Sequence, residues 1–435
     1  MFFLPKIRER LMASRLNDEV EFYKTITDAQ ISQYHLNEFG KIWAELQQNI
    51  PYYKKLVEQE LVPSTITSWD EFQKIPIKDR SYVKENIKYF SDSSRKPDKF
   101  VTTGGSTGTP LKYPSWKEEA HNYESNIWFA RDFYKIRWSD RMFRLWGHSH
   151  TLGSGLTKYK KQFAFFVGHP LIGYKRFSAY DLSNEKLKEA GQSIIKFKPS
   201  YIIGYSKALY MLAKANEDKK NKFHKLHLKA VIGGAEGFDK KEDEDFVSEV
   251  FGTKVGLEYA SMETKLLAHT HPDGGYRVLW RNNIVECVDE HGNPAQSGRV
   301  LVTSLYPRAF PLVRYELGDL IVNTNKVEHS VISFENVRGR DNDFLMLDKN
   351  TPIHSEAITH AIKFSDKIES YQIRYTTDFR YTIYIKSSDI ITNKEKEDIA
   401  SRLKQIDERL YKIPIVQTEV LKQTVAGKTK WLIKE

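Results

Sequence analysis

The sequence predicts an α/β fold. We expect a large N-terminal domain with mostly parallel, helix-covered sheets and a β-rich subdomain, followed by a small mobile α+β C-terminal domain. Three observations predict this: strand and helix patterns alternate from about residue 100, β-type patterns follow Gly275, and a β-β-α-β pattern ends the chain. A chain of 435 residues is also too long for one ordinary core. The expected domains are 1–338, helical over about 1–95, and 339–435.

The N-terminal part is expected to be helical. Between residues 15 and 60 apolar residues recur at three- and four-residue steps, and Pro51 is expected to end this run. Phe100-Val101 then reads as a strand that enters a Thr/Gly loop, and residues 111–113 as its return. Residues 115–118 match a capping box that opens a helix carrying Trp128.

The central part alternates between strand and helix. Its strands are predicted at 142–146, 201–203, 228–232 and 254–259, and its helices at 184–197, at 207–215 and in a segment ending at Gly252. Strands separated by helices of about 10–15 residues indicate a parallel sheet covered on both faces. Farther on, strands at 284–288 and 300–304 flank a turn at 291–294.

The last hundred residues predict a small α+β domain that begins near residue 340. Residues 371–375 and 381–385 alternate in polarity on either side of a turn, which indicates a hairpin. A helix is expected from Asn393, with its apolar face formed by Ile399, Leu403, Ile406 and Leu410. A final strand would place Val416, Thr418 and Val420 on one side.

Composition restricts the classes of partner. With 67 basic and 57 acidic residues the net charge is +10, spread along the chain. This favours anionic small molecules, acidic polymers or an anionic membrane surface, and does not indicate nucleic acid. The single cysteine, Cys287, excludes an internal disulfide and suits a reducing compartment. No segment approaches the ~18 apolar residues of a membrane span, and the start is not a secretion signal, so we expect no transmembrane segment and a cytoplasmic location.

The loop at residues 102–110 is rich in Thr, Ser and Gly. Glycine lets a backbone approach closely and hydroxyls donate hydrogen bonds, so such a loop can surround a polyphosphate. It matches neither GxxxxGK[ST] nor GxGxxG. By composition alone it fits a flexible surface loop equally well.

Five further polar clusters fall where this architecture would place a site, at the carboxyl ends of strands, at the domain boundary and near the chain's end. They are 232–236, 258–263, 314–319 and 338–341, and a fifth, 423–428, precedes the terminus. Each one alone also fits a tight turn, a helix cap or a solvated charge.

In this order, these motifs resemble the adenylate-forming (acyl-AMP) ligases, within them the phenylacetate–CoA ligase-like and capsule-biosynthesis (CapK-like) branch. The resemblance runs from residue 49 to Lys428 and is especially close over 300–319. It implies an ATP- and Mg²⁺-dependent ligase that activates a carboxylic acid as its acyl-adenylate. The acyl group would pass to coenzyme A or to an amine or hydroxyl acceptor, in polysaccharide or secondary-metabolite biosynthesis.

The resemblance also implies residue roles. Two anions must meet in adenylation, so positioning and charge neutralisation should dominate. Lys428 would bridge the carboxylate and the α-phosphate, and Glu263 would ligate Mg²⁺. Asp319 and Arg340 would bind the ribose, and Tyr259 would stack on adenine. The phosphates would be held by Thr103, Gly104, Gly105, Ser106, Thr107 (also catalytic), Gly108 and Thr109, and the adenine slot lined by Gly234, Ala235, Glu236, Glu258, Ala260 and Ser261.

For the acyl pocket the resemblance implies Gly233, His148 and Tyr205, although His148 and His150 also fit ordinary loop histidines. His269 and His271 lack further ligands nearby in sequence, so no histidine metal site is expected.

Three points stay open. The first is the identity of the acyl acceptor, because Asn342 stands where the family has an acidic hinge residue and residues 347–355 lack the family's glycine. The second is whether the chain is a nucleotide sensor without catalysis. The third is whether it is a binding module for acidic polymers, which would need longer basic clusters than those at 158–161 and 219–222.

Overall fold

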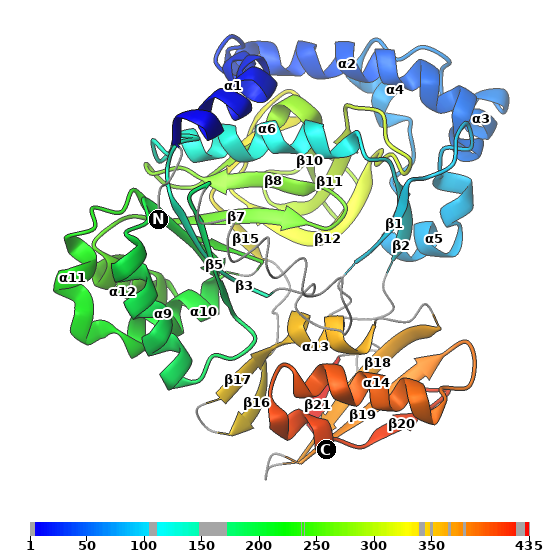
Figure 1. Cartoon of the computed structure of the whole chain (residues 1–435). Coiled ribbons are helices and arrows are strands. Elements are labelled where there is room, and N and C mark those ends of the chain that lie inside the picture. The colour runs from blue at the N-terminus through cyan, green and yellow to red at the C-terminus, as the bar shows by residue number, and fades with distance from the viewer. Residues whose placement is uncertain are drawn as a thin grey trace.

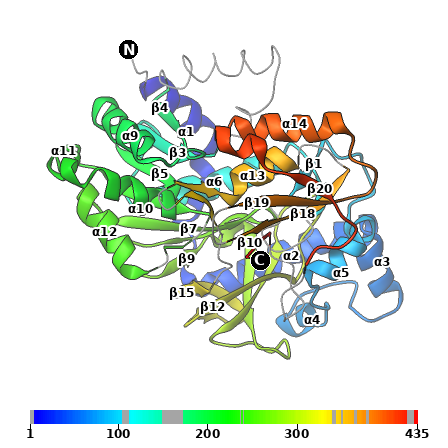
Figure 2. The same ribbon diagram turned by 90° about the horizontal axis from the view of Figure 1, so that it is seen from below.

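A computed structural model of the chain describes residues 5–103, 111–147, 172–235, 237–238, 240–338, 344–348, 351–363, 367–376, 380–422 and 431–434. Figure 1 shows a large unit that extends to β15 and a smaller unit, coloured orange to red, that begins at β16. Figure 2, seen from below, shows α13 and α14 of the smaller unit in front of the large unit's sheets. The predicted α/β class is confirmed, with a large parallel-sheet region and β-rich parts.

The N-terminal part is helical as predicted. It contains α1 (Pro5–Phe22), α2 (Asp28–Asn49), α3 (Pro51–Glu58), α4 (Trp69–Gln73) and α5 (Arg80–Glu85). Pro51 does follow the end of α2, but it also opens α3, since the first helical turn needs no N–H from that residue. The apolar face of α2, including Phe39 and Trp43, packs against Ile284, Leu305 and Val313 of the β-rich part.

Within the described residues, nine strands form one mixed sheet in the order β13-β14-β9-β8-β7-β6-β5-β3-β4. Its parallel half contains β3 (Met142–Trp146), β4 (Tyr174–Ser178), β5 (Tyr201–Tyr205), β6 (Ala230–Gly234) and β7 (Val255–Ser261). The antiparallel half contains β8 (Lys265–Thr270), β9 (Tyr276–Val278), β13 (Asn325–Val327) and β14 (Ser330–Phe334). The parallel prediction therefore holds up to β7.

Both faces of the parallel half are covered, because alternate residues of each strand point to opposite sides. Ile202 and Val231 pack with helices α9 (Asn184–Phe197), α10 (Ser206–Ala215), α11 (Lys220–His224) and α12 (Lys241–Phe251). Ile203 and Ile232 pack with α1 and α6 (Glu119–Asp132) on the other side. Figure 1 shows α9 to α12 in green and α1 and α6 in blue and cyan on these two sides.

A second sheet is antiparallel and consists, among the described residues, of β10 (Asn283–Val288), β11 (Gly298–Ser304), β12 (Tyr315–Val322) and β15 (Asn336–Arg338). Cys287 is buried in its core with Val300 and Val302. A separate hairpin, β1 (Lys99–Thr102) and β2 (Lys112–Ser115), flanks the predicted phosphate loop at residues 103–110.

The capping box predicted at residues 115–118 is wrong. Ser115 is held extended by pairing with Lys99 at the end of β2, so α6 begins only at Glu119. Glu118 instead pairs with Arg95 at 2.8 Å. At this helix start it is the Glu119 carboxylate that accepts a backbone N–H, that of Trp116, at 2.8 Å.

The smaller unit has a core that includes Ile399, Leu403, Ile406 and Leu410, the residues of the predicted helix face, although the helix itself ends at Lys404, before the last two of them. Its elements are β16 (Phe344–Asp348), β17 (Thr351–His354), α13 (Ser355–Ile362), β18 (Ile368–Tyr375), β19 (Tyr381–Ser387), α14 (Asn393–Lys404), β20 (Ile415–Gln417) and β21 (Leu432–Lys434). They include the predicted β-β-α-β unit. The boundary at residues 338–339 stays a prediction.

The final strand predicted over residues 416–420 is mostly wrong. Only Ile415–Gln417 is a strand, and it pairs with one edge of the sheet, where Val416 is 40% exposed. Val420 lies beyond that strand and is 75% exposed. The strand that fills the other edge is β21, which runs parallel to β18. No helix in the described ranges has the length and apolar character needed to cross a bilayer.

Candidate nucleotide-binding site

Two predicted nucleotide-binding residues from different sheets are in contact. The Tyr259 hydroxyl, on β7, donates to Oδ2 of Asp319, on β12, at 3.0 Å. Tyr259 is almost fully buried and meets Phe334 edge-on with ring centroids 6.1 Å apart, so its hydroxyl is well fixed. Gly318, just before Asp319, has φ +86°, a conformation that favours glycine. The glycine and the phenol together hold the Asp319 carboxylate in place.

A second predicted group lies at the ends of β6 and β7. Glu258 accepts a hydrogen bond from Arg131 through Oε1 at 2.5 Å. Burial alone would raise the pKa of the Glu258 carboxyl, but Arg131, His269 and Arg144 together more than offset this and keep that pKa below its usual value. The carboxyl is therefore ionised. A Cβ on Gly234 would stand 3.2 Å from Oε2 of Glu258 and 3.4 Å from the Trp146 ring, so glycine keeps this slot open.

A third group surrounds the start of the predicted phosphate loop. Arg80, the first residue of α5, donates to Oγ1 of Thr103 at 2.5 Å, and its Nη1 lies 3.6 Å from Oε1 of Glu263. Thr103 and Glu263 are both buried. One guanidinium therefore joins the described end of the loop to the carboxylate predicted to bind Mg²⁺.

The segment that carries Arg80 is attached to the strand that carries Asp319. The Lys78 N–H donates to the Arg314 carbonyl at 3.1 Å, and the Glu316 N–H donates to the Lys78 carbonyl at 3.0 Å. Arg314 is buried, pairs with Glu286 at 3.1 Å and donates to the carbonyls of residues 73 and 75. Within the 314–319 motif, Arg314 therefore positions the backbone around the site.

The cap of α5 provides a test of this arrangement. Asp79 Oδ1 accepts the Tyr82 N–H at 2.9 Å and caps the helix that presents Arg80. We expect Asp79→Ala to lower the free energy of unfolding by about 1 kcal/mol, because a helix N–H loses its partner. Asp79→Ser keeps an acceptor and should unfold at the parental urea concentration. Equal midpoints for all three proteins would show that the cap contributes nothing.

Comparisons with known proteins fit this geometry. No family model matches the chain. Protein CapK from Staphylococcus aureus is 22% identical over 375 residues, which cover 84% of this chain and 80% of CapK. An open conformation of 2-hydroxyisobutyryl-CoA ligase, with 2-HIB-AMP and CoA, superposes with a TM-score of 0.53 at 15% identity, over 94% of this chain and 91% of that one. In its thioesterification state the same ligase gives a TM-score of 0.54 at 16% identity, over 94% and 89%.

This chain has the adenylate-forming ligase fold. The resemblance predicted from the sequence, to that superfamily and its CapK-like branch, is confirmed. The binding roles of the three groups described above remain predictions.

The other predicted residues differ in their surroundings. Gly233 is packed tightly, since a Cβ there would collide with the Ser206 hydroxyl. Tyr205 is 0% exposed and accepts the Gly147 N–H at 3.2 Å, so it could act on an acyl group only through its neighbours. Ala260 is exposed, Ala235 has φ +68°, and Ser261 accepts the Thr264 N–H at 3.0 Å, which closes the turn that contains Glu263. Gly104, Gly105, Ser106, Thr107, Gly108, Thr109, His148, Glu236, Arg340 and Lys428 lie outside the described residues.

His269 behaves as a core residue of this fold. It is buried, its Nδ1 lies 2.9 Å from the Thr270 carbonyl, and burial and Arg131 lower its pKa to about 4. Within the described ranges no three His, Cys, Asp or Glu side chains are grouped as metal ligands.

Sequence reasoning missed several basic residues of the site. Arg80, Arg131 and Arg308 contact predicted residues, and Arg308 donates to the Glu263 carbonyl at 2.7 Å. Lys363 of the smaller unit lies close to α5, where burial, Lys84 and Arg80 lower its pKa to about 7. No motif marks these residues, because each reaches the site through the tertiary fold. The basic excess of the chain was the only sequence signal for them.

Proposed function

We propose that this chain is an ATP- and Mg²⁺-dependent ligase that converts a carboxylic acid to its acyl-adenylate and transfers the acyl group to coenzyme A, an amine or a hydroxyl. The contact between Tyr259 and Asp319 carries this proposal, because it joins two predicted nucleotide residues that are 60 positions apart. The shared ligase fold supports it. The coenzyme A bound to 2-hydroxyisobutyryl-CoA ligase supports a thiol as one of the acceptors.

The proposed chemistry joins two anions. A carboxylate oxygen of the acid bonds to the α-phosphorus of ATP, and the bond from that phosphorus to the pyrophosphate oxygen breaks. Asp319 would accept hydrogen bonds from the ribose hydroxyls, and Glu258 one from the adenine amine. Lys428 would hold the carboxylate against the α-phosphate. Arg80 would place a guanidinium beside the phosphates at the Thr103 end of the loop.

Glu263 fits a magnesium site that the substrate completes. Its carboxylate is buried, and its 3.6 Å separation from Arg80 is longer than a hydrogen bond. Mg²⁺ is usually held by one or two carboxylates together with substrate phosphates, so a single carboxylate is enough here. When bound, the ion would neutralise charge on the phosphates.

The pathway and the compartment are also proposals. The resemblance to capsule-biosynthesis proteins, with the 22% identity to protein CapK beside it, favours polysaccharide biosynthesis. A single cysteine in 435 residues, Cys287, suits the reducing cytoplasm.

The function is tested by exchange of labelled pyrophosphate into ATP across a panel of amino, aryl and sugar acids. We expect at least one acid to support exchange, and only when Mg²⁺ is present. If ATP binds and no acid in a broad panel supports exchange, the chain is a nucleotide sensor and the ligase proposal fails.

Glu263→Gln tests the metal carboxylate. Removing its charge should raise the Mg²⁺ concentration for half-maximal exchange about tenfold, because a hard cation prefers charged oxygen ligands. Glu335→Gln is the matched control, since Glu335 is exposed and its carboxylate accepts a hydrogen bond from Asn323. An unchanged Mg²⁺ requirement in Glu263→Gln would show that another group holds the ion.

A further inference from the structure

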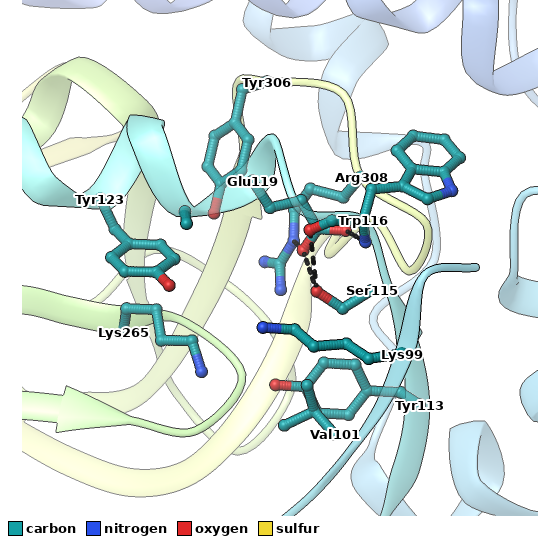
Figure 3. A pocket seen from close by; sticks show the side chains of 11 residues that line it. Lys99, Val101, Tyr113, Ser115, Trp116, Glu119, Tyr123, Lys265, Tyr306 and Arg308 are labelled. Carbon is teal, nitrogen blue, oxygen red and sulfur yellow. Dashed lines mark hydrogen bonds and ion pairs between the residues drawn. The ribbon is translucent and has the colours of Figure 1, made fainter. Parts of the chain in front are cut away.

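A second pocket lies beside the nucleotide site. It is bounded by the β1-β2 hairpin, the first turn of α6, the start of β8 and residues 306–308 (Figure 3). Its volume is about 310 Å³, part of it open to solvent. The side chains that matter here are Lys99, Tyr113, Glu119, Lys265 and Arg308.

Arg308 is the buried polar group of this pocket. It is 3% exposed, and its Nη2 donates to the Glu263 carbonyl at 2.7 Å. Among the described residues, its Nε and Nη1 have no hydrogen-bond partner, and Nε lies 3.7 Å from the Glu119 carboxylate. Burying unpartnered guanidinium donors is unfavourable. An oxygen-bearing ligand in the pocket would satisfy them.

Lys265 brings a second cation from the start of β8. Its φ is +58°, a conformation that glycine adopts more easily, so this lysine is kept at a backbone cost. Its Nζ donates to the Met262 carbonyl at 2.8 Å, which uses one of three hydrogens. Figure 3 shows the ammonium groups of Lys99 and Lys265 and the guanidinium of Arg308 pointing into the same space.

The charges around this space do not balance. Among the described lining residues Glu119 provides one carboxylate, and its two oxygens already accept hydrogen bonds. Its Oε1 accepts the N–H groups of Trp116 at 2.8 Å and Ala309 at 3.1 Å, and its Oε2 accepts the Ser115 hydroxyl at 3.2 Å. Three cations therefore face one shared carboxylate.

We propose that this pocket binds a small oxyanion of the phosphate class, separately from the nucleotide phosphates. Arg308 would contact it with its fork of donors, and Lys265 and Lys99 would contribute their ammonium groups. The hydrogen bond from Arg308 to the Glu263 carbonyl links this anion to the turn that carries the predicted metal carboxylate. Binding of the anion requires no adenylation, so it is independent of the proposed function.

Calorimetric titration of the full chain with sulfate, without ATP and at constant ionic strength in chloride, tests this site. The parent should bind sulfate saturably, and Lys265→Gln should weaken that binding at least about tenfold, because a charge-assisted contact is lost. Lys265→Arg should retain it. Lys112→Gln removes the same charge from an exposed lysine of the β1-β2 hairpin, one that does not line the pocket, and should bind like the parent. No saturable binding to the parent would overturn the proposal.

Two further comparisons complete the test: one locates the anion site, and the other identifies the anion. If binding is lost in Arg80→Gln but kept in Lys265→Gln, the anion sits at the nucleotide loop and the proposal is wrong. Inorganic phosphate and methyl phosphate are then compared in the parent. Tighter binding of methyl phosphate would identify a monoester as the ligand, and tighter binding of phosphate the free ion.

Discussion

Replacing Lys428 with alanine is expected to slow adenylation by about 10²-fold or more, by analogy with the loss of one oxyanion donor. The ammonium would draw the carboxylate and the α-phosphate together, so its loss removes transition-state stabilisation. The predicted adenine, ribose and metal residues Tyr259, Asp319 and Glu263 all belong to the large unit. ATP affinity should therefore stay close to that of the parent. Single-turnover adenylation and ATP titration measure the two quantities separately.

Lys430, two residues away, is the matched control. Lys430→Ala removes the same charge from the same segment and should adenylate at nearly the parental rate. Transfer from pre-made acyl-AMP should suffer much less than adenylation in Lys428→Ala, because the proposed role of this lysine is to join the carboxylate to the α-phosphate, a step that pre-made acyl-AMP has already passed. An inactive Lys430→Ala variant, or an equal loss in both half-reactions of Lys428→Ala, would show that the lysine is wrongly assigned.

The elements that the sequence predicts best are those whose periodic pattern is also their burial pattern. The strand at Met142–Trp146 and the helix at Asn184–Phe197 occur with the predicted bounds, because alternation and the helical period decide which face is buried. The errors arise where tertiary pairing outweighs a local signal. Pairing with Lys99 keeps Ser115 in a strand despite its capping motif, and an edge position leaves Val416 exposed despite its apolar character.

The residues of the candidate site fall into two similar groups: some belong to sequence motifs, and the others reach the site only through the tertiary fold. Tyr259, Asp319 and Glu263 belong to ordered motifs, so a single sequence is enough to propose them. Arg80 and Arg131 reach Thr103 and Glu258 across 23 and 127 residues, and no local spacing encodes such a contact. The same holds for the pocket around Arg308, which exists only once a hairpin, a helix and the turn at Glu263 are brought together.

Asp319→Ala is expected to weaken ATP binding by about 10²-fold or more. The carboxylate would accept charge-assisted hydrogen bonds from both ribose hydroxyls, each contributing about 1.5–3 kcal/mol. The carboxylate is already oriented by the Tyr259 hydroxyl at 3.0 Å, so little ordering remains to be done when ATP binds. Calorimetric titration with ATP measures the loss, and urea unfolding of the same variant checks that the fold is retained.

Tyr259→Phe separates orientation of the aspartate from its contact with the ribose. The ring, with its edge-on contact to Phe334, is kept, and only the hydroxyl that donates to Asp319 is lost. We expect Tyr259→Phe to weaken ATP binding by about tenfold or less, and to add almost nothing to Asp319→Ala, because the two residues act through one hydrogen bond. If Asp319→Ala lowers the free energy of unfolding while ATP affinity is unchanged, the aspartate serves only to join β12 to β7 and does not bind the ribose.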